Sequence, residues 1–308
     1  MILGLKVNAD RESADRLDGA KPPFVEVWFN IIDKDRYNDL FDELAKRHCQ
    51  IGLHFWGLLD GNIAPNIAYP DERVIKESMA LMRQTIDIAA GRHCKYVNIH
   101  PGASALSKVH YDKERYDLVS DPVDTDTSID LFLEHALELH EYAAAKNVVF
   151  TVETVPPCIT DGWYDPRARL TPKNVYELPP RAITRACDAG LWVANDFCHT
   201  AANAITTDPD AVFTFLKGIT VHLAPKTRLI HLGFVMPPYN GTDNHDELDN
   251  PLLQTNEAVP NHQQFIELLR MFQNRGDVWV LVEPSRNHVK NYFLAKQLID
   301  EAAGGTET

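Results

Sequence analysis

The sequence predicts an α/β fold, a single (β/α)₈ TIM barrel with long βα loops at its C-terminal face. The chain has 308 residues, which suits one barrel of roughly 250 residues plus loop insertions. Eight short apolar runs alternate with longer amphipathic stretches, the pattern of repeated βα units. The alternative, an open doubly wound sheet, is expected to carry a G-x-G-x-x-G turn, and the sequence contains none.

The apolar runs give the bounds of the expected strands. They are residues 2–8, 24–30, 50–56, 96–102, 148–154, 191–197, 227–233 and 278–284. Apolar residues at helical spacing predict helices over 35–48, 72–93, 127–146, 261–276 and 288–303. We expect Asn261 to cap the fourth of these helices and Gly276 to lie at its C-terminal end.

One catalytic domain is expected over residues 1–303, followed by a flexible polar tail at 304–308. Three βα connections are long, over residues 103–126, 155–171 and 234–260. The last two are rich in Pro, Gly, Asn, Asp and aromatic residues. Active-site loops at the C-terminal face of a barrel often have this character.

Composition and charge narrow the class of protein. The formal net charge of −14 makes a small sugar or phosphoester substrate a better expectation than DNA, because phosphate affinity comes mostly from clustered Lys and Arg. Five cysteines without C-x-x-C spacing indicate reduced thiols in a cytoplasmic protein. The start lacks a signal-peptide pattern, and no apolar run approaches the ~20 residues of a membrane span. A homo-oligomer remains open.

Residues that can bind metal recur where the expected strands end. Glu153 and Glu283 each close an apolar run, where an unpaired carboxylate is costly and a cation offsets the cost. The full set is His54, His100, Glu153, Asp196, His231 and Glu283 at six strand ends, His199 just after Asp196, and Asp243 and His245 in a long loop. Strand ends converge on one mouth of a barrel. Mixed imidazole and carboxylate ligands suit Zn²⁺, Mn²⁺ or Fe, although each residue alone could simply hydrogen-bond a loop.

The order of these residues resembles the xylose-isomerase-like TIM-barrel superfamily, and within it AP endonuclease family 2, the endonuclease IV-like branch. The matching motifs are HPG at 100–102, TVET at 151–154, DFCH at 196–199, HL at 231–232, DNH at 243–245 and VEP at 282–284. The resemblance covers roughly residues 1–303. It implies that the nine residues are ligands of a trinuclear zinc site, with Glu153, Asp196, His231 and Glu283 as an inner set. Sugar isomerases and epimerases of the superfamily use a similar inner set to hold one divalent metal.

The resemblance implies a metal-dependent hydrolase that acts on a phosphoester or related bond through two or three zinc ions, with Mn²⁺, Fe or Mg²⁺ as other metals. Glu153, Glu283 and His199 are its expected catalytic residues. One metal ion makes hydroxide from water and others neutralise the phosphate. The alternative is a sugar or sugar-phosphate isomerase or epimerase, which needs one metal and a separate base. A third reading is a catalytically idle barrel that binds a partner and holds no metal.

Substrate contacts are harder to assign. The segments after Glu153 and His231 depart from the endonuclease pattern, which leaves the substrate open. Trp163 and Tyr239 lie in long loops and could stack on a sugar or base. Arg286 follows Glu283 by three residues and could contact a phosphate or carboxylate. Loop packing and a solvated surface charge are the alternatives for these three residues. We expect Cys198 to be a core residue rather than a ligand.

Overall fold

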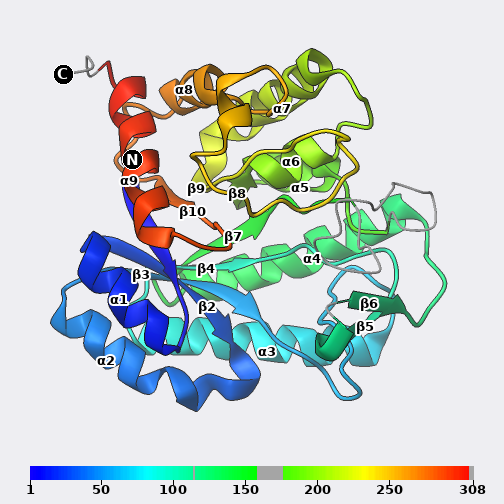
Figure 1. The fold of residues 1–308 in the computed structure, drawn as a ribbon. Helices are drawn as coiled ribbons and strands as arrows, with labels where there is room; N and C mark the ends of the chain where they lie inside the picture. The colour runs from blue at the N-terminus through cyan, green and yellow to red at the C-terminus, as the bar shows by residue number, and fades with distance from the viewer. Residues whose placement is uncertain (114, 158–175, 305–308) are drawn as a thin grey trace.

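The computed structural model describes residues 1–113, 115–157 and 176–304. Eight parallel strands close a barrel in the order β1-β10-β9-β8-β7-β4-β3-β2, with helices packed around it (Figure 1). The barrel strands are β1 Ile2–Val7, β2 Phe24–Asn30, β3 Gln50–Trp56, β4 Tyr96–Ile99, β7 Val149–Glu153, β8 Trp192–Asp196, β9 Thr227–Leu232 and β10 Trp279–Val282. The predicted (β/α)₈ barrel is confirmed, and each expected apolar run contributes one of these strands.

Helices follow the strands and cover the outside of the barrel (Figure 1). They are α1 Arg11–Ala20, α2 Asn38–Lys46, α3 Glu72–Gly91, α4 Thr125–Ala144, α5 Pro180–Asp188, α6 Phe197–Ala202, α7 Pro209–Leu223, α8 His262–Arg270 and α9 His288–Ala302, with short 3₁₀ helices η1 Ile31–Tyr37, η2 Tyr111–Lys113, η3 Ala224–Lys226 and η4 Pro251–Gln254. Several helices begin at aspartates whose side chains accept a backbone N–H of the first turn, as Asp71 and Asp124 do. None of the helices in the described part of the chain is long and apolar enough to cross a membrane.

Helix α8 begins where the sequence predicts and ends earlier. Asn261 and Gln264 form a reciprocal capping box at its start. The helix ends at Arg270 and not near Gly276. The N–H groups of Met271 and Phe272 bond to carbonyls three residues back, at 3.2 and 2.9 Å. This tighter spacing ends the α-helical ladder, so the expected end at Gly276 was wrong by about a turn and a half.

The interior of the barrel is divided into an apolar floor and a polar upper layer. The rings of Phe24, Tyr96 and Trp279, each at the first residue of its strand, fill the N-terminal end with centroids 5.0–6.1 Å apart. Gly52 gives the Tyr96 ring its room, because a Cβ there would lie 2.2 Å from Tyr96 Cζ. Charged side chains therefore gather above this floor, toward the C-terminal ends of the strands.

The long connections frame the mouth. Residues 103–126 contain an antiparallel hairpin, β5 Ser107–His110 and β6 Arg115–Leu118, where the sequence predicts only a long connection. The hairpin stands apart from the barrel strands (Figure 1). The Ile63↔Lys108 bridge joins it to the segment after β3, and that segment folds back on itself through the Leu59↔Ile63 bridge. A Val235↔Val259 bridge closes the base of the loop over 234–260. Residues 158–175, which include most of the predicted connection over 155–171, and residues 305–308 of the expected tail lie outside the described residues.

Candidate metal centre

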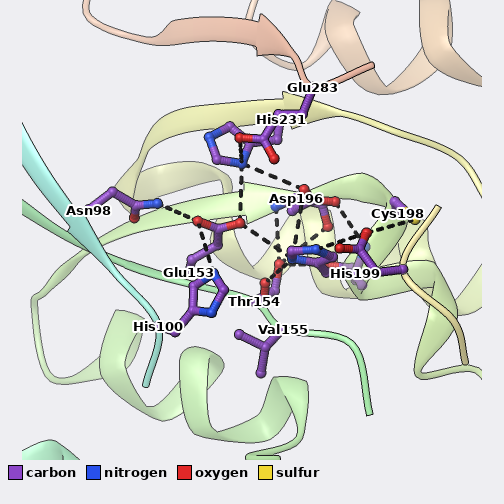
Figure 2. A network of polar contacts seen from close by, with 12 residues as sticks. Asn98, His100, Glu153, Thr154, Val155, Asp196, Cys198, His199, His231 and Glu283 are labelled. Carbon is purple, nitrogen blue, oxygen red and sulfur yellow. Dashed lines mark hydrogen bonds and ion pairs between the residues drawn. The ribbon is translucent and has the colours of Figure 1, made fainter. Parts of the chain in front are cut away.

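The nine predicted ligands come together at the C-terminal ends of the barrel strands. Four of them, His54, Glu153, Asp196 and His231, lie within strands; His100 and Glu283 come one residue after theirs; His199 lies in the first turn of α6; Asp243 and His245 lie in the loop over 234–260. Figure 2 shows Glu153 in the middle of this group, with side chains from neighbouring strands directed toward it. The parallel strands bring residues that are up to 229 positions apart in sequence, such as His54 and Glu283, within 3.9 Å.

The Glu153 carboxylate faces two different sets of imidazoles. Its Oε1 lies 3.1 Å from His231 Nδ1 and 3.3 Å from His199 Nδ1. Its Oε2 lies 3.8 Å from His54 Nε2 and 3.9 Å from His100 Nε2, and it accepts a hydrogen bond from Asn98. Burial by itself raises the pKa of Glu153, but the nearby imidazoles hold that pKa well below its usual range. Glu153 is therefore an anion that faces two ligand sets at once.

Asp196 serves both the local fold and the centre. Its Oδ1 caps α6 by accepting the His199 N–H at 2.9 Å. Its Oδ2 faces the centre, 3.5 Å from His231 Nδ1. The DFCH segment thus bends the chain directly from β8 into α6 and points Asp196 and His199 the same way. Cys198 between them is buried and its Sγ accepts the Asn244 N–H at 3.3 Å, which agrees with its expected core position.

A third ligand set lies at the edge toward the loop over 234–260. Asp243 Oδ1 is 3.2 Å from His199 Nε2, and its Oδ2 is 2.8 Å from His245 Nε2. Burial disfavours a charged Asp243, yet the imidazoles of His245 and His199 hold the pKa of Asp243 well below its usual range. Burial also disfavours a charged His245, but Asp243 beside it raises the pKa of His245 to about 9. The opposite nitrogens, Nδ1 of His199 and of His245, face the carbonyls of Thr154 and Glu283 at 2.8 and 2.5 Å. Such carbonyl contacts hold a proton on Nδ1 and direct Nε2 of each ring toward Asp243, the side on which a metal would bind.

Two observations show that a divalent ion fits these residues. His54 Nε2 is buried with no hydrogen-bond partner among the described residues, which is unfavourable unless a cation meets it. Two ligand atoms about 2.1 Å from one tetrahedral ion lie about 3.4 Å apart, close to the separations of 3.1–3.9 Å around Glu153. The sets His54–His100–Glu153 and Glu153–Asp196–His231 each bring three ligand atoms within 4.8 Å of one another. Their nitrogen and oxygen donors suit Zn²⁺, Mn²⁺, Co²⁺ or Fe.

Sequence reasoning missed two charged residues in the first two strands. Lys6 and Glu26 are register partners across β1 and β2, and Lys6 Nζ lies 2.6 Å from Glu26 Oε1. The Glu26 carboxylate also lies 3.3 Å from His54 Nδ1 and 3.4 Å from His231 Nε2, and it accepts the Tyr96 hydroxyl at 2.6 Å. A single charge inside each of the apolar runs ILGLKVN and FVEVWFN is the same signal that identified Glu153 and Glu283. Glu26 contacts the far side of two imidazole ligands and so fixes their orientation.

A cavity of about 340 Å³ opens beside the ligands. Four of the predicted ligands line it: His54, His100, His199 and Asp243. The aromatic residues Trp28, Trp56, Tyr111 and Tyr116 also line it, as does Glu177. Burial raises the pKa of Glu177 and outweighs the opposing effect of His199, so that this pKa is about 8. A second cavity of about 490 Å³ is lined by residues 235–246 of the long loop, Asp243 and His245 among them, and by Ser285.

The three predicted substrate contacts fall in different places. Tyr239 lines the second cavity, and its hydroxyl donates to the Glu257 carbonyl at 2.6 Å. Arg286 lines neither cavity; its side chain is 75% exposed and pairs with Glu247. Trp163 lies outside the described residues.

Known structures share this fold at low sequence identity. A D-tagatose 3-epimerase-like protein superposes with a TM-score of 0.64 and 15% identity, covering 99% of this chain and 97% of that one. D-psicose 3-epimerase from Clostridium cellulolyticum gives 0.58 and 11%, covering 98% and 96%. Endonuclease IV from Thermus thermophilus gives 0.55 and 13%, covering 98% and 100%. At these identities the likeness concerns the fold alone.

The sequence itself identifies the family. No curated protein matches the chain. The family model described as xylose isomerase-like TIM barrel matches residues 18–302, which includes all nine predicted ligands and every barrel strand after β1. The chain belongs to the xylose isomerase-like TIM-barrel family.

Proposed function

We propose that this protein is a divalent-metal-dependent isomerase or epimerase that moves a proton on a small sugar. The observation that carries the proposal is the cavity of about 340 Å³ that is lined both by imidazoles and by aromatic rings. Its volume is at the low end for small-ligand sites and suits one sugar-sized molecule. In the described part of the chain no Lys or Arg lines this cavity, which favours an uncharged substrate over a phosphate.

The inner set Glu153, Asp196, His231 and Glu283 would hold the metal. When bound, the metal would polarise the sugar's carbonyl and the neighbouring hydroxyl. The C–H hydrogen on the carbon that carries this hydroxyl then becomes acidic. Burial raises the pKa of Glu283, but Lys6 beside it lowers that pKa to about 2. Its carboxylate is thus an anion at neutral pH, and in the proposed reaction it takes the substrate proton. The rings of Trp28 and Trp56 supply flat apolar walls against which a sugar can lie.

Glu177 completes the proton chemistry that we propose. Glu177 lines the cavity together with His199 and Asp243, and with a pKa of about 8 it carries its proton at neutral pH. A carboxylate that accepts and a carboxyl that donates are the pair of groups that acid–base catalysis requires. The backbone around Glu177 is held in place, because Ala103 and Glu177 form a bridge and the Ser104 N–H donates to the Tyr176 carbonyl at 2.7 Å.

The test is exchange of substrate hydrogen with solvent deuterium. Protein loaded with Mn²⁺ or Co²⁺ is incubated with a panel of ketohexoses and ketopentoses in D₂O, and NMR reports deuterium next to the carbonyl. This readout detects proton abstraction without requiring the product to be known. We expect exchange on at least one sugar, lost on chelation and in Glu283→Gln, and retained in the surface control Glu134→Gln. A fully metal-loaded protein that exchanges no sugar hydrogen contradicts the proposal.

Phosphoester hydrolysis is the second candidate, and the ligand set beyond the inner four favours it. His199, Asp243 and His245 form a connected set of their own, and one-metal proton transfer does not need it. Multinuclear sites cleave phosphoesters by activating water and neutralising the leaving oxygen. Release of nitrophenol from bis(4-nitrophenyl) phosphate, and cleavage of a duplex with an abasic site, test this function on the same preparations.

A further inference from the structure

A second group of four residues, which shares three members with the predicted ligands, also has the composition of a metal site. Glu26, His54, His231 and Glu283 each offer one ligand atom, and these atoms all lie within 4.8 Å of one another. Glu26 and both imidazoles are buried. By composition and spacing alone this group would bind a divalent ion as readily as the sets around Glu153.

The Lys6 ammonium already lies among these ligand atoms. Its Nζ is 2.6 Å from Glu26 Oε1 and 2.8 Å from His54 Nδ1, and it donates to Glu283 Oε1. The Trp28 ring lies 5.1 Å from Nζ on another side, a favourable contact for a cation. The Lys6 side chain is 11% exposed. Lysine thus contacts three of the four candidate ligands and supplies positive charge to two buried carboxylates.

We propose that Lys6 takes the place of a metal ion in the group Glu26–His54–His231–Glu283, which limits metal binding to the other faces of the two imidazoles. Each ring has a nitrogen on either side. His54 Nε2 and His231 Nδ1 face Glu153 at 3.8 and 3.1 Å, whereas His54 Nδ1 and His231 Nε2 face Glu26 at 3.3 and 3.4 Å. A divalent ion on the Glu26 side would contact the ammonium directly, and the two cations would repel. The inference rests on the metal centre of the proposed function and is independent of the substrate.

The first experiment removes the charge of Lys6. Purified Lys6→Met is freed of metal, equilibrated with saturating Zn²⁺, dialysed and counted by elemental analysis. We expect about one zinc ion per chain more than in the original protein, because the vacated group regains its carboxylates. Lys6→Met/Glu26→Gln removes the charge and a ligand together and should show no gain. The exposed Lys46→Met, whose side chain is 76% exposed, is the matched control for loss of a lysine. A folded Lys6→Met protein with the original zinc content overturns the proposal.

A second variant decides the matter if Lys6→Met does not fold. Glu26→Gln keeps the shape of the side chain and leaves Lys6 paired with Glu283. If lysine occupies the group, Glu26→Gln holds the original number of zinc ions at saturation. If the group binds metal in the original protein, Glu26→Gln holds one fewer, and the proposal is wrong. These counts are read without substrate, so absence of sugar exchange would refute the proposed function and leave this inference standing.

Discussion

Glu153→Gln should weaken metal binding at two positions at once. The two carboxylate oxygens of Glu153 face different ligand sets, with His231 and Asp196 near Oε1 and with His54 and His100 near Oε2. Glutamine keeps the shape and loses the charge that both ions would share. His100→Asn removes a candidate ligand from one of these sets, because His100 belongs to the group with His54 and Glu153, and its Nε2 lies 3.9 Å from Glu153 Oε2.

The magnitude follows from ligand linkage. An ion at 100 times its Kd stabilises the fold by about 2.7 kcal/mol, so two ions contribute about 5 kcal/mol. At about 2 °C per kcal/mol for a chain of this size, that is a rise in Tm of about 10 °C. If Glu153→Gln weakens each site about 100-fold, each ion retains about 0.4 kcal/mol and the rise falls to about 2 °C. His100→Asn should keep about 5 °C, and the exposed Glu134→Gln should keep it all.

The assay is calorimetry of each protein with chelator and with zinc at 100 times the Kd of the original protein, which a competition titration supplies. The reasoning depends on the shared position of Glu153. A Glu153→Gln protein that keeps half of the metal-induced rise in Tm would refute it, because the carboxylate would then serve one ion and not two. Equal losses in Glu153→Gln and His100→Asn would refute it in the same way.

Further predictions concern the floor of the barrel, the cavity and the response to acid. In urea unfolding, Gly52→Ala should destabilise the fold by about 1–3 kcal/mol, since the added Cβ would meet the Tyr96 ring. In the same assay Gly218→Ala should stabilise the fold by about 0.5–1 kcal/mol, because Gly218 lies on α7 with open space around it. Trp56→Ala removes a ring from the cavity wall and should raise KM for an exchanging sugar by roughly 2- to 12-fold, equivalent to about 0.5–1.5 kcal/mol, with kcat kept. Burial lowers the pKa of His288 from 6.5 to about 4. Between these pH values the unfolded chain binds a proton at His288 and the folded protein does not, so the free energy of unfolding falls as pH drops from 6.5 toward 4. His288→Asn should therefore lose less of its urea midpoint between pH 7 and pH 5, and an equal loss would contradict this.

The position of the candidate site could be predicted from the order of residues alone. Parallel strands in a closed barrel end at one mouth, so Glu153, Asp196 and His231 had to become neighbours once each was placed at a strand end. Their motifs are also local: Asp196 caps the helix that carries His199, and three residues of spacing suffice for that. The approximate strand bounds could also be predicted, because a barrel strand is covered by helices on its outer face and therefore reads as a continuous apolar run.

Other features depended on contacts between strands and loops that are distant in sequence. Whether the charge of Lys6 points into the barrel, and which ligands it meets there, follows from the register of β1 against β2 and from the ring of Trp28 beside it. Arg286 lies near Glu283 in sequence yet turns outward to Glu247, a partner set by the fold of the loop over 234–260. The sequence by itself determined the barrel and the convergence of the nine candidate ligands, since both follow from periodicity and chain order. Only the tertiary structure decided which nitrogens of His54 and His231 face Glu153 and which face Glu26, because that choice depends on the packing of Lys6 and Glu26 from the two strands where no site was expected.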